Sequence, residues 1–301
     1  MPTFPERESG ILAKMKSKGG NPELSEFKGP DSNFELFREG GLSYEKRKNG
    51  DKYFEENDAP VHLLGSEKGL LYQNGTLHIS FELQTNGSVC QVTLGILNKT
   101  MLPLLNFSVQ PLERLNMPAL RFPQTLFVHL EPRGSKKLIV QCECTSPDNE
   151  CPIIEFFYQH EELNRKLSLT LPVFLSTYGT PIEFNKNLFS QKWLQLESPA
   201  AETVNIFLPC SNFTAEDLET KITSMKFSVL HNIDINPNNI FCASVVFCKK
   251  LQISALLRLE PNYEGNKYRL TIRTSHPEAT RILSRLIKIR FQLPNYLNKE
   301  I

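Results

Sequence analysis

The sequence predicts an immunoglobulin-like β-sandwich followed by an α+β domain with an antiparallel sheet and flanking helices, which we call the platform domain. From about residue 63, short segments of alternating apolar residues follow one another, separated by turn signals and without helical patterns between them. After about residue 184, helical and strand patterns are mixed. The predicted divisions are a flexible, hinge-like arm (1–62), the sandwich (63–178), the platform (179–294) and a tail (295–301).

Length and composition limit the class of protein. The chain has 301 residues, 40% of them hydrophobic, which is enough for two globular domains. The net charge of +1 argues against a general electrostatic attachment to nucleic acid or to an anionic membrane. The best apolar run, Ile240–Cys248, is too short to span a bilayer, and the opening MPTFPERESG lacks the apolar core of a secretory signal.

Cysteine usage indicates a reducing compartment. Of the seven cysteines, Cys142, Cys144 and Cys151 are close in sequence but lack a fourth ligand at metal spacing. Cys242 and Cys248 lie in an apolar run and are predicted core residues. We therefore expect reduced thiols in a cytoplasmic protein that holds neither a metal ion nor a cofactor.

The arm at residues 1–62 differs in composition from the rest. Gly, Pro, Lys and Glu dominate it, and no hydrophobic period is sustained, which is typical of a linker or a disordered segment. Phe34–Phe37 (FELF) has two interpretations, a short recruitment motif or part of a solvated tail. The composition favours the tail.

The sandwich is predicted from strand-like alternation. Turn signals such as Asn86-Gly87 and Pro132–Ser135 separate the apolar segments. The Cys-Trp-Cys signature of antibody domains is absent, so the likeness to immunoglobulins is architectural. The predicted strands are Leu77–Leu83, Cys90–Ile96, Leu126–Leu130, Leu138–Cys144, Ile153–Tyr158 and Leu167–Val173.

Helices enter the prediction after a joint at Tyr178–Phe184. Asn187–Leu196 is predicted to be a short helix. Thr214 and Asp217 match a capping box at the start of a second helix. Pro277 predicts the start of a third.

A strand–turn–strand segment, Leu251–Thr274, dominates the platform. Alternation along both strands places Arg258, Arg269 and Arg273 on one face, with only Glu260 as a nearby acid. Such a cluster has two interpretations, carboxylate recognition or a solvated face with intramolecular ion pairs, and exposed ion pairs are common. The residues predicted to form the turn are Pro261, Asn262, Gly265 and Asn266.

Catalytic motifs are missing from the sequence. It contains no glycine-rich phosphate loop, no Gly-x-Ser-x-Gly and no histidine pair at metal spacing. We therefore expect a binding protein rather than an enzyme, although an enzyme with an unrecognised site is the alternative from another class.

Trp193 is the only tryptophan in the chain. It is either a core residue or a platform on which a peptide ring packs, and the polar neighbours Gln191 and Lys192 favour incomplete burial. Beside arginines, such a platform suits a short peptide that carries an aromatic ring and a carboxylate.

Several segments resemble the C-terminal appendage, or ear, of alpha-adaptin, the large subunit of the plasma-membrane clathrin adaptor complex. They are WLQLESPAAETVNIF (Trp193–Phe207), DINPNNI (Asp234–Ile240) and LLRLEPNYEGNKYRLTIRTS (Leu256–Ser275). A weaker, collinear match includes LNKTMLPLLNF (Leu97–Phe107). The resemblance implies a sandwich followed by a platform, the same order as the strand pattern predicts.

The resemblance also implies a non-enzymatic function. The family's platform binds motifs of endocytic accessory proteins such as Asp-Pro-Phe, Asp-Pro-Trp and Phe-x-Asp-x-Phe. By position, the pocket tryptophan is Trp193, the two arginines are Arg258 and Arg269, and a pocket-side glutamate is Glu202. A second peptide site on the sandwich is implied without assignable residues.

One departure from the family concerns the pocket. Where the family has a phenylalanine three residues before the tryptophan, this chain has Ser190. Either the adjacent Phe189 supplies the ring, or the pocket is shallower here.

The resemblance further implies a place in clathrin-mediated endocytosis and vesicle transport, at plasma-membrane clathrin-coated pits. Accessory proteins are the implied partners, together with other adaptor subunits and clathrin if the chain is part of a full-length adaptin. An appendage of a related coat subunit, such as beta-adaptin or coatomer gamma, is the alternative. The segments LLRLEPN and YRLTIRTS favour alpha-adaptin.

Overall fold

The computed structural model describes residues 60–123, 128–211, 213–262 and 267–293. Nearly all of the predicted arm, including Phe34–Phe37, and the predicted tail lie outside the described residues. None of the described helices is both long enough and apolar enough to cross a membrane.

The sandwich consists of two antiparallel sheets. A five-stranded sheet has the order β1-β2-β3-β6-β5, and a three-stranded sheet has the order β4-β7-β8. A short 3-10 helix, η2 (Val61–Leu63), precedes them. The bounds are β1 (Lys68–Gln73), β2 (Leu77–Asn86), β3 (Val89–Asn98), β4 (Leu105–Pro111), β5 (Ala119–Arg121), β6 (Ser135–Glu143), β7 (Ile153–His160) and β8 (Leu163–Thr170).

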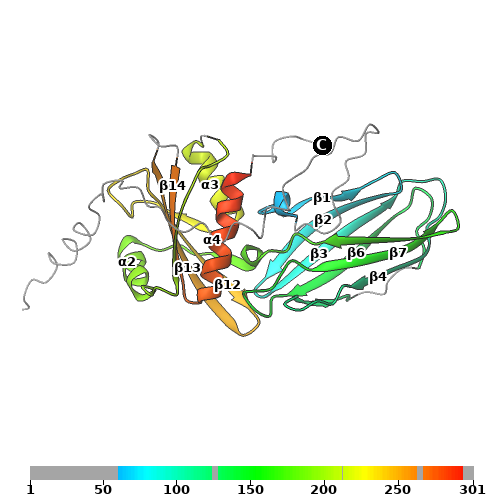
Figure 1. Cartoon of the computed structure of the whole chain (residues 1–301), viewed down its shortest axis with the longest axis horizontal. Helices are drawn as coiled ribbons and strands as arrows, with labels where there is room; N and C mark the ends of the chain where they lie inside the picture. Colours follow the sequence, from blue (N-terminus) through cyan, green and yellow to red (C-terminus); the bar gives the residue numbers. More distant parts are fainter. Residues whose placement is uncertain (1–59, 124–127, 212, 263–266, 294–301) are drawn as a thin grey trace, which may run out of the picture. The chain divides into compact units, whose positions relative to one another are not determined.

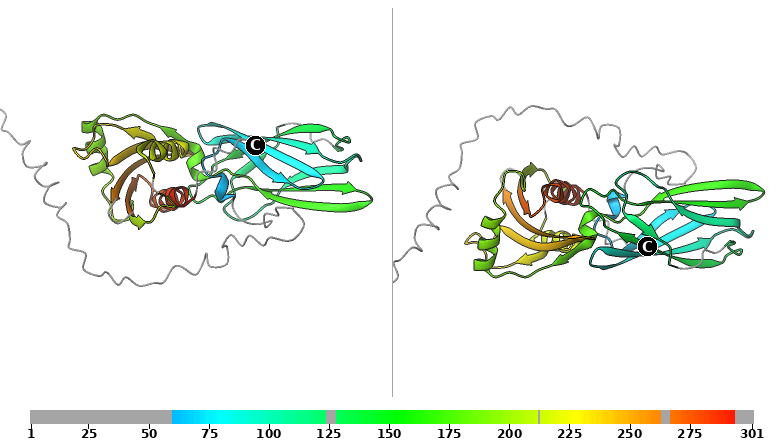
Figure 2. Two further views of the ribbon diagram at one scale, coloured as in Figure 1. Left: turned by 90° about the horizontal axis from the view of Figure 1, so that it is seen from above. Right: turned by 90° about the horizontal axis from the view of Figure 1, so that it is seen from below.

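The sandwich core lies between the two sheets, which Figure 2 shows face to face. Alternate residues of β2, β3 and β6 are buried, as the period of a half-buried strand requires. Aromatic rings fill the opposite layer, where Phe107 lies 6.0 Å from both Phe156 and Tyr158 between ring centroids. The alternation seen in the sequence therefore produces the predicted core.

Most predicted sandwich strands are confirmed, but the strand predicted at Leu126–Leu130 is wrong for its described part. There, Leu130 forms only an isolated bridge with Leu104, and residues 124–127 lie outside the described residues. The prediction also missed β1, β4 and β5. The four central residues of β1 are all half-buried, so this strand lacks the alternation of buried and exposed residues by which strands were predicted.

The platform is a six-stranded antiparallel sheet of order β10-β14-β13-β12-β11, with β9 pairing on β12. The 3-10 helix η3 (Leu175–Tyr178) leads into it from the sandwich. The strand bounds are β9 (Gly179–Pro181), β10 (Glu202–Phe207), β11 (Ser228–Leu230), β12 (Ile240–Cys248), β13 (Leu251–Asn262) and β14 (Lys267–Thr274). The helices are α2 (Lys186–Gln195), α3 (Ala215–Ser224) and α4 (Pro277–Gln292).

Helices cover both faces of the platform sheet. Figure 1 shows α2 on one side of the strands and α3 with α4 on the other. The larger core joins Leu257 and Ile272 of the sheet to Ile287 of α4. A smaller core, under α2, contains Phe189 and Phe241. The platform is therefore a three-layer arrangement, with one thin layer formed by a single short helix.

The predicted helices are confirmed, with small shifts at their ends. Asn185 caps α2, because its side chain accepts a hydrogen bond from the backbone N–H of Leu188. Thr214 and Asp217 form the predicted capping box of α3. Pro277 occupies the first turn of α4, where its missing N–H costs nothing.

The turn between β13 and β14 is shorter than predicted. Pro261 and Asn262 belong to β13, opposite Tyr268 and Lys267 of β14, so their assignment to the turn is wrong. Proline is tolerated in a strand where the ladder does not need its N–H. Residues 263–266, including Gly265, lie outside the described residues.

The predicted boundary at residues 178 and 179 falls between η3 and β9. All described residues belong to one compact unit, and the larger hydrophobic core contains residues of both the sandwich and the platform. The Tyr178 hydroxyl, for example, donates a hydrogen bond to the carbonyl of Cys142 at 3.2 Å. The division into two domains at this point therefore stays a prediction.

Candidate functional site

The face of the platform sheet below α2, which we call the α2 face, carries the predicted site. Strand register places Arg273 beside Glu202, Arg269 beside Ile206, and Arg258 beside Thr271. Residues of one parity on each strand share a face, so the three predicted arginines do lie on one side. The α2 face comprises Glu202, Val204 and Ile206 of β10; Lys267, Arg269, Thr271 and Arg273 of β14; Leu256, Arg258 and Glu260 of β13; and Phe241 and Ala243 of β12.

Trp193 lies on α2, half-buried at this face. Its ring stacks on Phe189, with centroids 5.6 Å apart and an interplanar angle of 22°. Phe189 in turn meets Phe241 edge-on at 5.3 Å. The indole is thus neither fully in the core nor free in solvent, and its role as a platform for a peptide ring stays a prediction.

Phe189 is only 3% exposed. Its ring supports the indole from below, so it does not replace at the surface the phenylalanine that the family has at the position of Ser190. Ser190 itself is half-buried. Of the two alternatives for the pocket, this geometry favours the shallower one.

Arg273 fixes the position of Trp193. Its guanidinium lies 4.5 Å from the centroid of the indole ring, and Nη1 donates a hydrogen bond to the Trp193 carbonyl at 2.7 Å. Nε donates to the carboxylate of Glu202, and Glu197 lies 3.9 Å away. Arg273 is 9% exposed. Arg273 therefore connects the sheet to α2, and we call this set of contacts the Arg273 clamp. Glu202 fixes the position of the guanidinium within it.

Arg258 is already engaged within the protein. Its Nη2 lies 2.8 Å from Glu260 and 3.8 Å from Asp234, and its guanidinium lies 5.6 Å from the Phe241 ring. Its Nε is buried without a hydrogen-bond partner. The charge of Arg258 is thus largely neutralised by Glu260 and Asp234, and its Nε is left without a hydrogen bond.

Arg269 is the more available cation. Its side chain is 58% exposed, and its distance to Glu260 is 3.8 Å. That carboxylate is shared with Arg258, which lies closer to it. An incoming carboxylate therefore meets least competition at Arg269.

The expectation that Glu260 would be the only nearby acid is wrong. Asp234, Glu202 and Glu197 also face the arginines. Burial opposes ionisation of Asp234, but hydrogen bonds from Asn239 and from backbone N–H groups, with the charge of Arg258, lower the pKa of this carboxyl. Part of the arginine charge is thus neutralised by intramolecular ion pairs.

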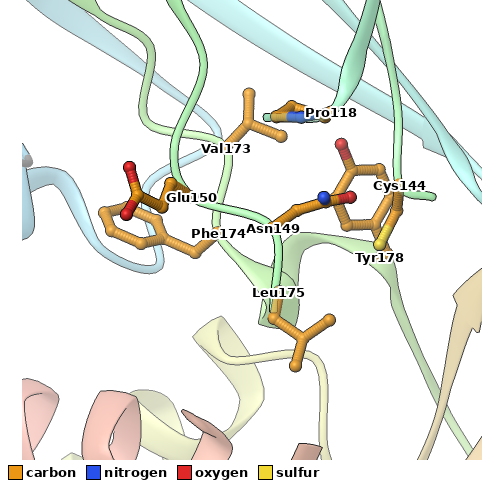
Figure 3. A pocket seen from close by; sticks show the side chains of 8 residues that line it. All are labelled: Pro118, Cys144, Asn149, Glu150, Val173, Phe174, Leu175 and Tyr178. Atoms are coloured by element: carbon orange, nitrogen blue, oxygen red, sulfur yellow. The ribbon is translucent and has the colours of Figure 1, made fainter. Parts of the chain in front are cut away.

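Two hollows of the described surface lie away from the α2 face. A small cavity of about 10 Å³, close to the volume that one water needs, is lined by residues such as Cys144 and Tyr178 (Figure 3). A larger hollow of about 400 Å³ is lined by residues that include Glu67 and Lys226. Neither is lined by a predicted site residue. Within the described ranges, no group of three His, Cys, Asp or Glu residues is placed to hold a metal ion.

Comparison with known proteins gives a consistent result. Residues 177–291 match the family described as alpha adaptin AP2, C-terminal domain. These bounds begin within η3 and end one residue before the last residue of α4. The match thus covers the whole platform sheet and the α2 face.

Relatives extend the similarity beyond the platform. The AP-2 complex subunit alpha-2 of Dictyostelium discoideum is 25% identical over 224 residues, covering 73% of this chain and 22% of that protein. The AP-2 complex subunit alpha of Schizosaccharomyces pombe is 26% identical over 231 residues, covering 74% of this chain and 25% of that protein. The chain therefore spans about a quarter or less of the length of these relatives.

Among solved structures, the GAE domain of GGA2p from Saccharomyces cerevisiae aligns with 35% of this chain and 96% of that domain. Its sequence identity is 15% and its TM-score 0.29, which is too low to bear on the fold. The resemblance therefore depends on the sequence matches. The family match covers the platform, and the AP-2 relatives align with almost three quarters of the chain. By these matches, the chain resembles the C-terminal appendage of alpha-adaptin.

Proposed function

We propose that this chain is a clathrin adaptor appendage that recruits endocytic accessory proteins through short peptides carrying an aromatic ring and an acid. The proposed site is the α2 face at Trp193, Arg258 and Arg269. The motifs are those of the family, Asp-Pro-Phe, Asp-Pro-Trp and Phe-x-Asp-x-Phe. The proposal includes no catalytic step.

One observation carries the proposal. Trp193 is held by the stacked ring of Phe189 and by the guanidinium of Arg273, and it remains only half-buried. A preorganised aromatic surface loses little entropy when a ligand ring packs on it. Neighbouring arginines supply donors for the acid of the motif.

The roles of the predicted residues differ within this proposal. Trp193 receives the ligand ring, and Arg269 receives the carboxylate because it is the more exposed arginine. Arg258 takes part by exchanging its ion pair with Glu260, because its Nε is buried. Glu202 and Phe189 act indirectly, as supports of Arg273 and Trp193. Ser190 leaves the pocket shallow.

Such a site binds weakly. The intramolecular acids compete with the peptide carboxylate, and the contact area of a short motif is small. We expect dissociation constants in the micromolar range or weaker, with affinity in a coat gained from several motifs acting together. Weak, multivalent contacts suit the reversible assembly of a coated pit.

The cellular setting follows from the family. We propose a cytoplasmic protein at plasma-membrane clathrin-coated pits, with accessory proteins as partners and, within a longer adaptin, the other adaptor subunits and clathrin. An appendage of beta-adaptin or coatomer gamma is less well supported, because the family match and the reported relatives are alpha subunits.

A direct binding assay tests the assignment of the site. A fluorescently labelled Phe-x-Asp-x-Phe peptide is titrated with the full chain, and Arg269→Glu is compared with the same charge change at Arg114, an exposed residue of the sandwich. We expect Arg269→Glu to weaken binding at least ten-fold and Arg114→Glu to leave it within two-fold. Equal effects of the two changes would mean that overall charge, rather than the α2 face, governs binding.

A further inference from the structure

The edge strand β10 has an unusual distribution of apolar side chains. Val204 is 44% exposed, Ile206 is 68% exposed, and Leu208, just after the strand, is 57% exposed. The opposite side of the strand is more polar, and Asn205 there donates a hydrogen bond to Ser284 of α4 at 2.7 Å. The strand thus presents its more apolar side to solvent.

β10 also has a free backbone edge. In the described sheet it pairs only with β14 and stands at the end of the strand order. Natural edge strands are usually protected by charges, prolines or bulges, because unpaired N–H and C=O groups invite another strand. The edge strand β8 of the sandwich follows this rule, with Arg165 and Lys166 in its exposed half. β10 has a regular register and a single acid, Glu202, which is already paired with Arg273.

Positive charge lies next to this apolar edge. Ile206 is the register partner of Arg269, and Lys267 projects from the same face of β14 two residues away. Lys267 is exposed, and the Arg269 side chain is 58% exposed. A ligand strand paired with β10 would therefore lie next to the apolar side chains of β10, and the cationic side chains of β14 would lie one strand further into the sheet.

We propose that β10 binds an extended acidic peptide by strand addition. The peptide backbone pairs with the free edge, aliphatic side chains pack on Val204, Ile206 and Leu208, and carboxylates meet Arg269 and Lys267. The chemistry required is a stretch in which aliphatic and acidic residues lie two apart, so that both kinds of side chain project from the face that Val204, Ile206 and Arg269 share. This site uses residues other than Trp193, and it shares with the proposed peptide site only Arg269.

Charge selects this occupant over a second copy of the chain. Two copies paired through β10 would match their apolar edges, but neither would bring a free acid to Arg269 or Lys267. The only acid of β10 itself is Glu202, which holds the Arg273 clamp. An acidic peptide satisfies both the apolar edge and the cations.

Fluorescence anisotropy with the full chain tests the proposal. The probe is labelled Thr-Val-Thr-Asp-Thr-Ile-Thr-Glu, which as a strand carries its aliphatic and acidic side chains on one face and has no aromatic ring for Trp193. The test variant is Val204→Thr with Ile206→Thr, because threonine keeps the β-branched shape that strands favour while removing apolar surface. The matched control is Leu163→Thr, which changes an aliphatic residue, 54% exposed, on the other edge strand, β8. A second probe carries N-methyl groups on consecutive amides, so that neither of its edges can pair with a strand.

We expect saturable binding that weakens about ten-fold in the double threonine variant, which is the effect of removing about one aliphatic side chain from a buried interface. Leu163→Thr and Trp193→Ala should leave it within two-fold, and the N-methylated probe should not bind. Unchanged affinity in the double variant, equal weakening with Leu163→Thr, or full binding of the N-methylated probe would each overturn the proposal. So would a concentration-dependent dimer in sedimentation that the double variant abolishes.

The same set separates this proposal from the proposed function. Trp193→Ala should abolish binding of an Asp-Pro-Phe peptide and spare the aliphatic probe. The double threonine variant should do the reverse. If the natural chain binds only one of the two peptides, the site assigned to the other peptide is wrong, and the site assigned to the bound peptide is tested by its own variant.

Discussion

Replacing Arg273 by methionine removes the clamp that joins α2 to the platform sheet. Methionine keeps most of the side-chain length but cannot make the hydrogen bond to the Trp193 carbonyl, the ion pair with Glu202 or the cation–π interaction with the indole ring. Arg273 is 9% exposed, so water replaces these interactions poorly. The change should destabilise the fold and loosen Trp193 together.

The size of the effect follows from the interactions that the guanidinium makes. Hydrogen bonds to charged groups contribute about 1.5–3 kcal/mol, and a cation over an aromatic ring contributes about 0.5–2 kcal/mol depending on desolvation. These terms overlap, because one guanidinium takes part in all of them. We expect the free energy of unfolding to fall by roughly 2–4 kcal/mol. Adding Glu202→Gln, which removes the unpaired carboxylate, should restore about 1 kcal/mol.

Urea denaturation followed by far-ultraviolet circular dichroism measures this destabilisation. Fluorescence of Trp193, the sole tryptophan, reports the local change. We expect a red-shifted, less anisotropic emission in the variant, because the indole loses its second support. Arg281→Met is the control, since Arg281 makes a solvent-exposed ion pair with Glu278 and should cost little.

The reasoning would be refuted by a destabilisation below about 0.5 kcal/mol with unchanged Trp193 emission. That result would show that α2 is held by the packing of Phe189 alone. An equal destabilisation in the Arg281 control would likewise remove any special role for the clamp.

Three further predictions concern binding and stability. Trp193→Ala should abolish binding of an Asp-Pro-Phe peptide by calorimetry with a small loss of stability, whereas unfolding of the platform would make this residue part of the core. Lys221→Met should lower the free energy of unfolding in urea by about 1–3 kcal/mol. The reason is that the buried Nζ donates hydrogen bonds to the carbonyls of Arg290 and Leu293 at the end of α4. An unchanged urea midpoint would contradict this capping role. Stability should fall as the pH rises above about 9, since burial raises the pKa of Cys142 and Cys242 well above that of an unfolded thiol. The unfolded chain then loses protons that the folded chain keeps, so each thiol contributes a slope of up to about 1.4 kcal/mol per pH unit, and a double Cys→Ala variant should show a smaller slope than the natural chain.

Short-range patterns in the sequence predicted much of the platform. Alternation along β13 and β14 placed three arginines on one face, and the register confirms this. The capping box of Thr214 and Asp217 located the start of α3, and Pro277 located the start of α4, each to within one residue. These features depend on neighbours within a strand or a turn, which the sequence shows directly.

Long-range contacts could not be predicted in the same way. The clamp of Arg273 depends on Glu202, which lies 71 residues earlier in the chain and becomes its neighbour only when β10 pairs with β14. Asp234 reaches Arg258 from the segment before β12. Neither contact leaves a periodic signal in the sequence. The sequence therefore shows fewer acids beside the arginines than the structure does.

The apolar edge of β10 is an intermediate case. The segment ETVNIFL shows alternating apolar residues, but the sequence alone does not tell which set faces the core. In the structure, the exposed fractions of Val204 and Ile206 and the hydrogen bond of Asn205 with α4 show that these two side chains face outward. The same alternation would otherwise predict that these aliphatic residues are buried.

Titration of the full chain with an Asp-Pro-Phe peptide, followed through Trp193 emission, tests the central proposal most directly. The sole tryptophan is the proposed contact, so no other indole contributes to the signal. We predict a saturable change in the micromolar range that a scrambled peptide of the same composition does not produce. No change in emission, with no heat of binding by calorimetry, would contradict a peptide site at the α2 face.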